Sequence, residues 1–291
     1  MVPHISLPIL LPIILPIFFG RAINSQATAV GSCQWASLRM ITDTYAKSQQ
    51  RGEIDPLLTA SNSTIYRENA VTTPITSGLL SKPMNVDYSR TLIDQGNCAT
   101  YTELIITDPR NPHVVGTQIR FRPTTANGKL EVVLIDSVVA TTGHEGFNAT
   151  GTLRGVEGQR WDSIARANQP NREGLKAVAD VYLDLWDNTN TSSTTNTTGT
   201  GTEVVLVYDT PCVRLQGGEL VTESCVPPVI TSQGVKGANT DRRYVIDETV
   251  GGVSVFSSFG SKGGVPDSHE FRIVEGKVQF VQQILAAKEE V

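Results

Sequence analysis

Two side chains in this sequence could donate a hydrogen bond or move a proton from an apolar surrounding. His269 alternates with Phe271 and Ile273 in a segment that predicts a β-strand, so the three side chains share one face. A histidine on such a face is either a hydrogen-bonded core residue or the acid, base or donor of a pocket. Tyr101 lies on another predicted strand, beside apolar neighbours. His269 and Tyr101 are therefore the candidate catalytic residues, and a core role for His269 stays open.

Four more residues are candidates for contacting a substrate. Three of them are expected to flank, together with Tyr101, the mouth of the first of two sheets: Tyr66, Asn69 and Glu103. The fourth, Trp161, lies in a long connection, where it could cover an apolar ligand or pack between two domains. The sequence thus predicts a mainly apolar pocket with few polar groups.

Two aspartates and two arginines recur at matching places. Asp94 and Asp247 each end an apolar strand. A buried acid is costly unless it is paired, so a structural hydrogen bond to the next turn and a role as catalytic base are both open. Arg120 and Arg272 are expected on the strand face opposite His269. Packing between sheets, ion pairing with a carboxylate and contact with substrate are the alternatives for them.

Local motifs for well-known chemistries do not occur in the sequence. It lacks the motifs of serine-hydrolase elbows, zinc proteases, phosphate-binding loops and dinucleotide sites, although a hydrolase triad assembled in space stays open. The histidines show no pair at metal-ligand spacing and no C-x-x-C occurs, so neither a metal nor a cofactor is expected. The net charge of −5 argues against a nucleic-acid partner.

Most of these candidate residues lie in a sequence pattern that occurs twice in the chain. Three pairs of segments match in the same order: Leu38–Tyr45 with Leu175–Tyr182, Arg90–Asp94 with Arg243–Asp247, and Gln118–Phe121 with Glu270–Ile273. Each copy reads as a helix followed by long strands and turns, with chance similarity between two β-meanders as the alternative. The predicted fold class is α+β, with two tandem units that each pack a helix on a curved antiparallel sheet.

The N-terminal segment resembles a secretory signal peptide. An apolar run from Ile5 to Phe19, broken by prolines, precedes the small-residue pattern Ala27–Ala29. The run is too short for a stable membrane span, and an uncleaved anchor is the alternative. The expected location is outside the cell or in the secretory lumen. The expected organisation is a signal peptide (1–29), a first domain (30–140), a connection (141–170), and a second domain (171–291) with a low-complexity insert (188–202).

Cysteines and glycosylation sequons agree with that compartment. Four cysteines allow three pairings, and separately folding halves favour Cys33 with Cys98 and Cys212 with Cys225. Four N-x-S/T sequons predict exposed loops that can carry glycans, at Asn62, Asn148, Asn190 and Asn196.

The first half resembles a known superfamily. A helix containing Tyr45, a stop at Gly52, the pair Leu57-Leu58 and a strand at Tyr66–Asn69 are similar to the NTF2-like superfamily, which includes the SnoaL-like polyketide cyclases. The resemblance implies two cone-shaped units, and by analogy with other curved sheets a homodimer. The second half departs from the pattern, because the low-complexity insert and the cysteine loop replace its early elements.

The whole chain is also similar to a family of secreted fungal proteins with a domain of unknown function. The segments that carry the similarity are Leu80–Pro83, Cys98–Ile105, Phe147–Arg154, Arg242–Thr249 and Pro266–Arg272. Relatives of that family include cofactor-free cyclases of fungal secondary metabolism, which join a tropolone quinone methide to a terpene olefin by a hetero-Diels–Alder reaction. The resemblance implies a cyclase of this type acting on a small hydrophobic substrate.

Such a cyclase needs no nucleophile, metal or redox group, so the missing motifs do not count against it. It needs an apolar pocket that positions both reactants and a donor that polarises a carbonyl. The alternatives are a secreted, non-catalytic protein that binds a small apolar ligand, and a structural protein whose units are filled by side chains.

Overall fold

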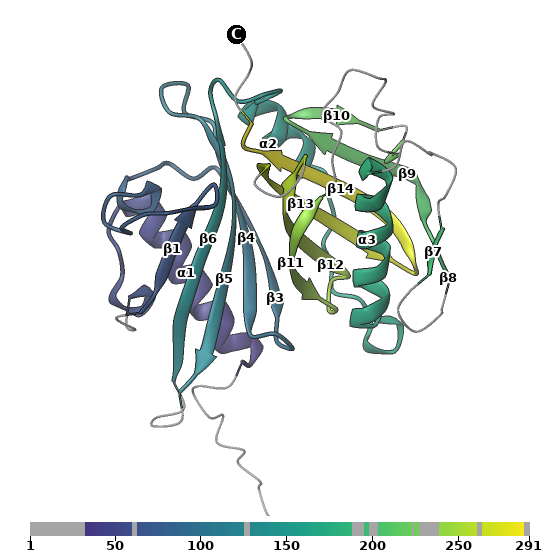
Figure 1. The fold of residues 1–291 in the computed structure, drawn as a ribbon, viewed down its shortest axis with the longest axis horizontal. Helices are drawn as coiled ribbons and strands as arrows, with labels where there is room; N and C mark the ends of the chain where they lie inside the picture. The colour runs from purple at the N-terminus through teal and green to yellow at the C-terminus, as the bar shows by residue number, and fades with distance from the viewer. Residues whose placement is uncertain are drawn as a thin grey trace, which may run out of the picture.

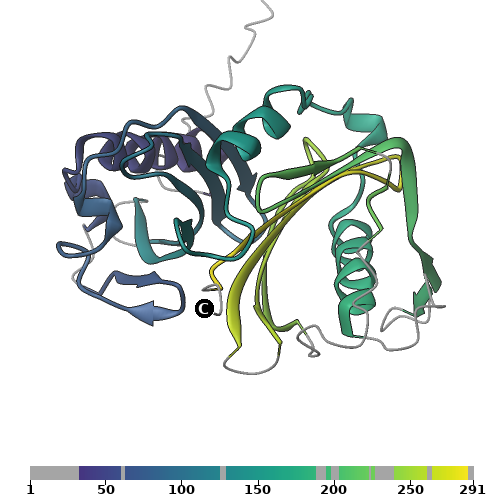
Figure 2. The ribbon, with the colours of Figure 1, turned by 90° about the horizontal axis from the view of Figure 1, so that it is seen from above.

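The computed structural model describes residues 33–59, 63–124, 129–187, 195–197, 203–222, 224–226, 239–260 and 264–287. The fold is α+β: two six-stranded sheets lie side by side, and one long helix packs on each. The two helices lie on the sides of the sheets that face away from each other (Figures 1 and 2). We call the contact region between the sheets the seam. We call the sheet faces under the helices the inner faces.

The first unit consists of one helix and the first sheet. Its elements are α1 (Trp35–Arg51), β1 (Ile65–Glu68), β2 (Val71–Thr72), β3 (Tyr88–Asp94), β4 (Ala99–Ile106), β5 (His113–Pro123) and β6 (Leu130–Thr141), with 3-10 turns at Pro56–Leu58 and Leu79–Ser81. The strand order is β2-β1-β6-β5-β4-β3, and β1 runs parallel to β6 while the other neighbours are antiparallel.

The second unit repeats this arrangement. Its elements are α3 (Arg172–Asp187), β9 (Val207–Gln216), β10 (Glu219–Val221), β11 (Thr240–Asp247), β12 (Gly252–Phe259), β13 (Val265–Val274) and β14 (Lys277–Leu285). The order β10-β9-β14-β13-β12-β11 is that of the first sheet, and β9 is again parallel to β14. A separate pair, β7 (Thr195–Thr197) and β8 (Glu203–Val205), lies in and beside the predicted low-complexity insert.

Strand register shows that the repeat in the sequence is a repeat in space. Asp94 pairs with the first residue of β4, and Asp247 pairs with the first residue of β12. A β-bulge follows Arg120 in the first sheet and Arg272 in the second. Bulges fix register and re-aim side chains, so their common position makes residues of the two sheets directly comparable. The prediction of two tandem, sheet-based α+β units is confirmed.

Helix α1 shows how the sequence forms the first inner face. Leu38, Ile41 and Tyr45 recur at helical spacing and are buried against the sheet. Gly52 ends the helix in a left-handed conformation with φ of 68°, and a Cβ there would meet Pro83.

The apolar pair Leu79-Leu80 lies in the segment that joins β2 to β3. Both side chains are buried in the first core. The reason is the 3-10 turn Leu79–Ser81, which aims them inward. Backbone groups of this segment are bonded by the side chains of Gln49 and Tyr66.

Three hydrophobic cores result from this arrangement. One lies between α1 and the first sheet, and one between α3 and the second sheet. The third fills the seam, where Leu92 and Tyr101 of the first sheet meet Val245 and Phe256 of the second. The rings of Tyr101 and Phe256 meet edge to face, with their centroids 6.2 Å apart.

The connection between the units contains a helix that the sequence does not suggest. Helix α2 (Ala149–Glu157) begins at Asn148, whose side chain accepts a hydrogen bond from the Gly151 N–H. An asparagine at this place caps the otherwise unpaired amides of a helix start. The threonine- and glycine-rich sequence of α2 has low helix propensity, which is why the segment reads as irregular. Asn148 itself is exposed, as expected for a sequon.

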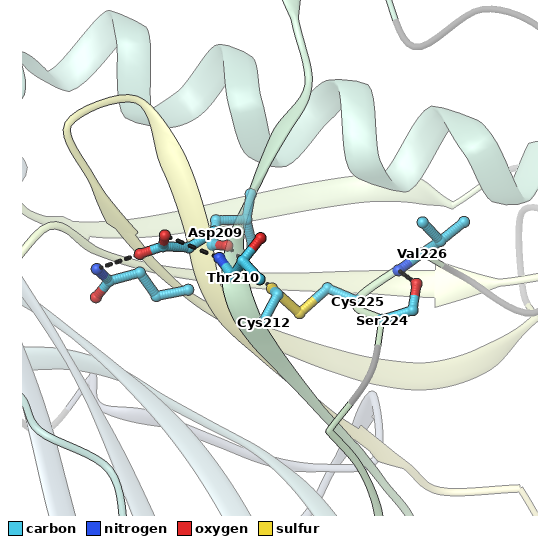
Figure 3. Close-up of a disulfide and its surroundings, with 8 residues drawn as sticks. Asp209, Thr210, Cys212, Ser224, Cys225 and Val226 are labelled. Carbon is cyan, nitrogen blue, oxygen red and sulfur yellow. Dashed lines mark hydrogen bonds between the residues drawn. A yellow bond between two sulfur atoms is a disulfide. The ribbon is translucent and has the colours of Figure 1, made fainter.

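Both expected disulfides are present. Cys33 is bonded to Cys98 and joins the start of α1 to β4. Cys212 on β9 is bonded to Cys225, close to α3 (Figure 3). Neither bridge crosses between the units, and both fit an oxidising compartment.

Some predictions concern residues outside the part of the chain that the structure describes. The signal peptide and the sequons at Asn62 and Asn190 lie outside the described residues, and the side chain of Asn196 does too. Within the described residues, no helix is long and apolar enough to cross a membrane.

Candidate functional site

The inner face of the second sheet carries a cluster of polar side chains under α3. His269 pairs with Gln283 of β14, and Asp267, two residues before His269 on β13, pairs with Leu285. Arg214 of β9 pairs with Val281 of β14, so it shares the face of Gln283. Trp186 of α3 and Tyr208 of β9 pack against the same core. We call this cluster the inner site: Asp267, His269, Gln283, Arg214, Trp186 and Tyr208.

His269 lies at the centre of the inner site and is only 1% exposed. Its ring stacks on Phe271 at a centroid distance of 5.9 Å and contacts Tyr182 and Trp186 of α3 at 6.0 and 6.3 Å. Its Nδ1 lies 2.8 Å from Oδ2 of Asp267. An aromatic cage and a carboxylate therefore fix the orientation of the imidazole.

Asp267 is itself held in place by two donors. Gln283 Nε2 donates to Oδ1 at 3.0 Å, and Ser257 Oγ donates to Oδ2 at 3.3 Å. A carboxylate fixed in this way can orient a neighbouring imidazole, as in catalytic dyads and triads. The arrangement can thus serve as a donor or as an acid–base pair.

Several polar atoms of the inner site are buried without a partner. Among the described residues, no hydrogen bond reaches the side-chain atoms His269 Nδ1 and Nε2, Trp186 Nε1, Arg214 Nε, Gln283 Oε1 and Tyr208 Oη. The contact from His269 Nδ1 to Asp267 is thus close enough for an ion pair but lacks the direction of a hydrogen bond. Buried polar atoms are nearly always satisfied in folded proteins, so such a group of exceptions indicates a place for a ligand or for water.

The corresponding positions of the first unit carry side chains that are hydrogen-bonded to one another. Register places Thr117 and Ser137 where the second sheet has His269 and Gln283. Tyr45 Oη is 2.7 Å from Thr117 Oγ1, which is 2.8 Å from Ser137 Oγ. Burial raises the pKa of Tyr45 to about 12, so this chain of hydroxyls stays neutral. At these two positions the first unit has hydroxyls bonded to each other and to Tyr45, whereas the second has His269 and Gln283, which keep side-chain atoms without hydrogen-bond partners.

A second polar cluster lies at the seam, around Arg90 of β3. Arg90 Nε donates to Glu270 Oε1 at 3.1 Å, and Nη2 donates to Glu103 Oε2 at 2.9 Å. The guanidinium also lies 4.4 Å from the Trp161 ring centroid. We call this the seam junction: Arg90, Glu103, Glu270, Gln282, Gln159 and Trp161. It ties both sheets to the connection between them.

Charges at the seam junction do not balance, because one guanidinium faces two buried carboxylates. Burial raises the pKa of Glu103 to about 7, and the charge of Glu270 adds to that rise while Arg90 opposes it. Glu103 therefore carries a proton in the folded protein at a pH where an exposed glutamate would be ionised.

We expect this proton to make the protein less stable as the pH rises from about 5 to 7. Below the unfolded pKa of Glu103 both states bind the proton, and above about 7 neither does. Between these limits the folded state binds more protons than the unfolded state does. The free energy of unfolding therefore falls by about 3 kcal/mol as the pH rises through this range. Urea unfolding at stepped pH measures it. Glu103→Gln should flatten this dependence, and an unchanged slope in that variant would refute the assignment.

The structure separates the residues that the sequence expects at one mouth. Tyr101 and Glu103 face the seam, because the alternate residues of β4 point toward α1. Tyr66 and Asn69 belong to the first unit: Tyr66 Oη donates to Glu68, and the Asn69 side chain bonds both backbone groups of Val139. Both roles are structural hydrogen bonds.

The two candidate catalytic residues are also apart. Tyr101 lies at the seam, and His269 lies on the far, inner face of the second sheet. Trp161 joins Glu103 through Arg90 at the seam junction, with its ring 4.4 Å from the guanidinium. Of the predicted site residues, only His269 lies in the inner site.

The repeated aspartates join the two units to each other. Asp94 Oδ2 accepts a hydrogen bond from the Ile246 N–H at 3.0 Å, and Asp247 Oδ2 accepts one from the Ile93 N–H at 2.9 Å. Each also bonds its own next turn, as the structural alternative predicts. Arg172 of α3 forks onto Asp94 with two bonds of 2.7 Å.

The repeated arginines face the seam, as strand alternation predicts. Arg120 donates to the carbonyl of Tyr244 at 2.9 Å, and Arg272 donates to the carbonyls of Val250 and Asp162 at 2.6 and 3.0 Å. Packing between the sheets is therefore the alternative that the structure supports for Arg120, whereas Arg272 joins a turn of its own sheet to the connection.

Sequence reasoning missed most partners of His269 and of Glu103. Asp267 was within reach, because it alternates with His269 on one strand. Trp186 lies on the apolar stripe of α3 and reads as core. Arg214 gives no signal, since its strand pairs with β14 across about 65 residues of sequence. Arg90 and Glu270 are brought together only by the docking of the two sheets.

Within the part of the chain that the structure describes, hollows of two sizes lie along the seam. A cleft of about 350 Å³ lies where the C-terminal ends of β3 and β11 meet the connection. Its lining is mainly polar and includes Gln95, Arg166, Gln169 and Glu248. The other, of about 20 Å³, lies between Phe147 and Ile284 and has room for roughly one water molecule. No three His, Cys, Asp or Glu side chains in the described part of the chain cluster as metal ligands would.

Residues 168–285 match a protein family described as a domain of unknown function, DUF8021. The matched region begins just before α3 and ends with β14, so it holds every residue of the inner site. No curated protein and no solved structure matches the chain.

Proposed function

We propose that the protein is a cofactor-independent cyclase that holds a hydrophobic natural-product intermediate at the inner site of the second unit. The reaction is of the hetero-Diels–Alder type expected from the sequence resemblance, between a tropolone quinone methide and a terpene olefin. One carbon–carbon and one carbon–oxygen bond form, and no proton, electron or group is gained or lost. A site for this reaction needs shape and one donor rather than a nucleophile.

One observation carries the proposal: the second inner face has buried polar atoms without partners where the first has a closed chain of hydroxyls. The fold does not require unpaired atoms at the positions of His269 and Gln283, because the first unit has the bonded hydroxyls of Thr117 and Ser137 there. Leaving a buried donor or acceptor unpaired costs about 1–3 kcal/mol each. A bound ligand that satisfies them would offset this cost.

The residues around His269 fit the chemistry. When protonated, His269 pairs through Nδ1 with Asp267 and offers its Nε2–H to a ligand oxygen. A hydrogen bond to the carbonyl oxygen of a heterodiene draws electrons from it and lowers the barrier to cycloaddition. The rings of Trp186, Tyr182 and Phe259 supply apolar surface for the hydrocarbon parts of both reactants.

We also infer that each unit is NTF2-like. Support comes from a helix that precedes each sheet in the chain and packs on it, from the shared strand order, and from inner-face polar residues at matching positions in both units. In a cone-shaped fold the inner face is where a ligand is held, which agrees with the place of the inner site.

The test is incubation of the purified protein with a quinone-methide precursor and a terpene olefin. Product yield and stereochemistry are compared with a protein-free reaction. We expect faster product formation and one dominant stereoisomer. A Tyr101→Phe variant should match the unchanged protein, because Tyr101 lies at the seam. Loss of turnover in Tyr101→Phe would place the site at the seam instead. Binding of the reactants without any acceleration would favour the non-catalytic binding protein.

A further inference from the structure

We propose that the ligand of the inner site is a planar conjugated molecule bearing a negatively charged oxygen, such as an enolate, phenolate or carboxylate, and that Arg214 binds this oxygen. The inference names the ligand class and one further binding residue for the site on which the proposed function rests. Three observations support it: most unpaired atoms of the inner site are hydrogen-bond donors, Arg214 has no anionic partner among the described residues, and aromatic rings surround the site.

Donors predominate among the unpaired atoms of the inner site. Trp186 Nε1 and Arg214 Nε can only donate, and the Tyr208 hydroxyl can donate. Burial raises the pKa of Tyr208 well above its usual range, so this hydroxyl keeps its proton. Gln283 Oε1 is the one side-chain atom among them that can only accept. A ligand that satisfies the set must therefore be rich in acceptor atoms.

The charge of the inner site points the same way. Asp267 lies beside His269 and accepts hydrogen bonds from Gln283 and Ser257, so its oxygens already have donors within the protein. Arg214 is half-buried, and in the described part of the chain it forms no ion pair. Its Nη1 donates a hydrogen bond to the neutral side-chain oxygen of Gln216 at 2.5 Å. A guanidinium with a buried, unbonded Nε–H is a fitting partner for an anionic oxygen.

The surroundings favour a flat ligand. Trp186 meets Phe259 edge to face at 5.7 Å, and Tyr182 meets Phe271 edge to face at 5.1 Å. His269 and Arg214 lie on strands two places apart, which separates their backbones by roughly 10 Å. A molecule of about two fused rings has a length comparable to that separation.

Calorimetric titration of the full chain with three matched probes tests the inference. The probes are 1-naphthoate, naphthalene, and 1-naphthylmethylammonium, which share one ring system and differ in charge. We expect 1-naphthoate to bind at least tenfold more tightly than the other two. Arg214→Met should remove about tenfold or more of that affinity, and Arg214→Lys, which keeps the charge, should restore part of it. Arg154→Met, at an exposed arginine of α2, is the matched control and should bind like the unchanged protein.

The outcomes separate this inference from the proposed cyclase activity. Equal binding of the three probes, or full affinity for 1-naphthoate in folded Arg214→Met, overturns the ligand class even if cyclisation is observed. Conversely, charge-selective binding that depends on Arg214 supports the inference even if no reactants are ever converted. If Arg214→Met does not fold, Trp186→Phe keeps a ring and removes one donor. It must then weaken 1-naphthoate more than naphthalene, and equal weakening refutes the inference.

Discussion

Replacing His269 with phenylalanine should lower product formation about a hundredfold while the protein still folds. Phenylalanine keeps the bulk of the ring among Phe271, Tyr182 and Trp186, so packing changes little. It removes the group that polarises the carbonyl, which is worth roughly 3 kcal/mol in the transition state. Asp267 keeps its bonds from Gln283 and Ser257. Single-turnover rates and melting temperatures of the two proteins measure both effects.

The matched control is Thr117→Val, at the corresponding position of the first unit. It breaks the hydroxyl chain between Tyr45 and Ser137, so it should cost about 1 kcal/mol of stability. It should leave turnover unchanged, because Thr117 belongs to the first unit and the inner site lies in the second. If His269→Phe instead unfolds the protein and its folded fraction is fully active, His269 is a core residue and the site lies elsewhere.

Replacing Arg90 with methionine should reduce the free energy of unfolding by about 3–5 kcal/mol. Methionine fills a similar volume but leaves Glu103 and Glu270 buried without their counter-ion. Removing one partner of a buried charge cluster is costly, because the remaining carboxylates must stay buried without a counter-ion or take up a proton. Urea unfolding followed by circular dichroism gives the change.

A matched control and a rescue make the Arg90 result specific. Arg122→Met removes an exposed arginine paired with Glu131 at 3.0 Å, and it should cost less than about 1 kcal/mol. Adding Glu103→Gln and Glu270→Gln to Arg90→Met removes the stranded charges and should recover part of the loss. A loss from Arg90→Met no larger than that from Arg122→Met would show that the seam does not depend on the seam junction.

Local patterns predicted much of the fold because they repeat or alternate within short segments. The repeat gave two matching units, and alternation on β13 placed His269 on the face of Phe271. The expectation that each cysteine pairs within its own half predicted both disulfides. Each of these inferences needs only the identity of nearby residues or the confinement of pairs to one copy.

The candidate site was harder to predict, since it depends on which face of each sheet the helix covers. Alternation shows that Tyr101 and Glu103 share a face, but it does not show that this face meets the other unit. Arg90 and Glu270 are 180 residues apart and meet only through docking of the sheets. Arg214 reaches the inner site through the parallel pairing of β9 with β14, which leaves no short-range trace.

The exchange of hydrogen bonds between Asp94 and Asp247 has the symmetry of a homodimer. Each carboxylate caps an amide on the other unit's outermost strand, as in an isologous interface where residue i contacts j and j contacts i. Here both partners belong to one polypeptide, so dilution cannot separate them. In a true homodimer any substitution appears in both subunits at once. When both units belong to one polypeptide, each can change independently. The first unit can therefore keep the hydroxyls of Thr117 and Ser137, while the second has His269 and Gln283 at the same positions.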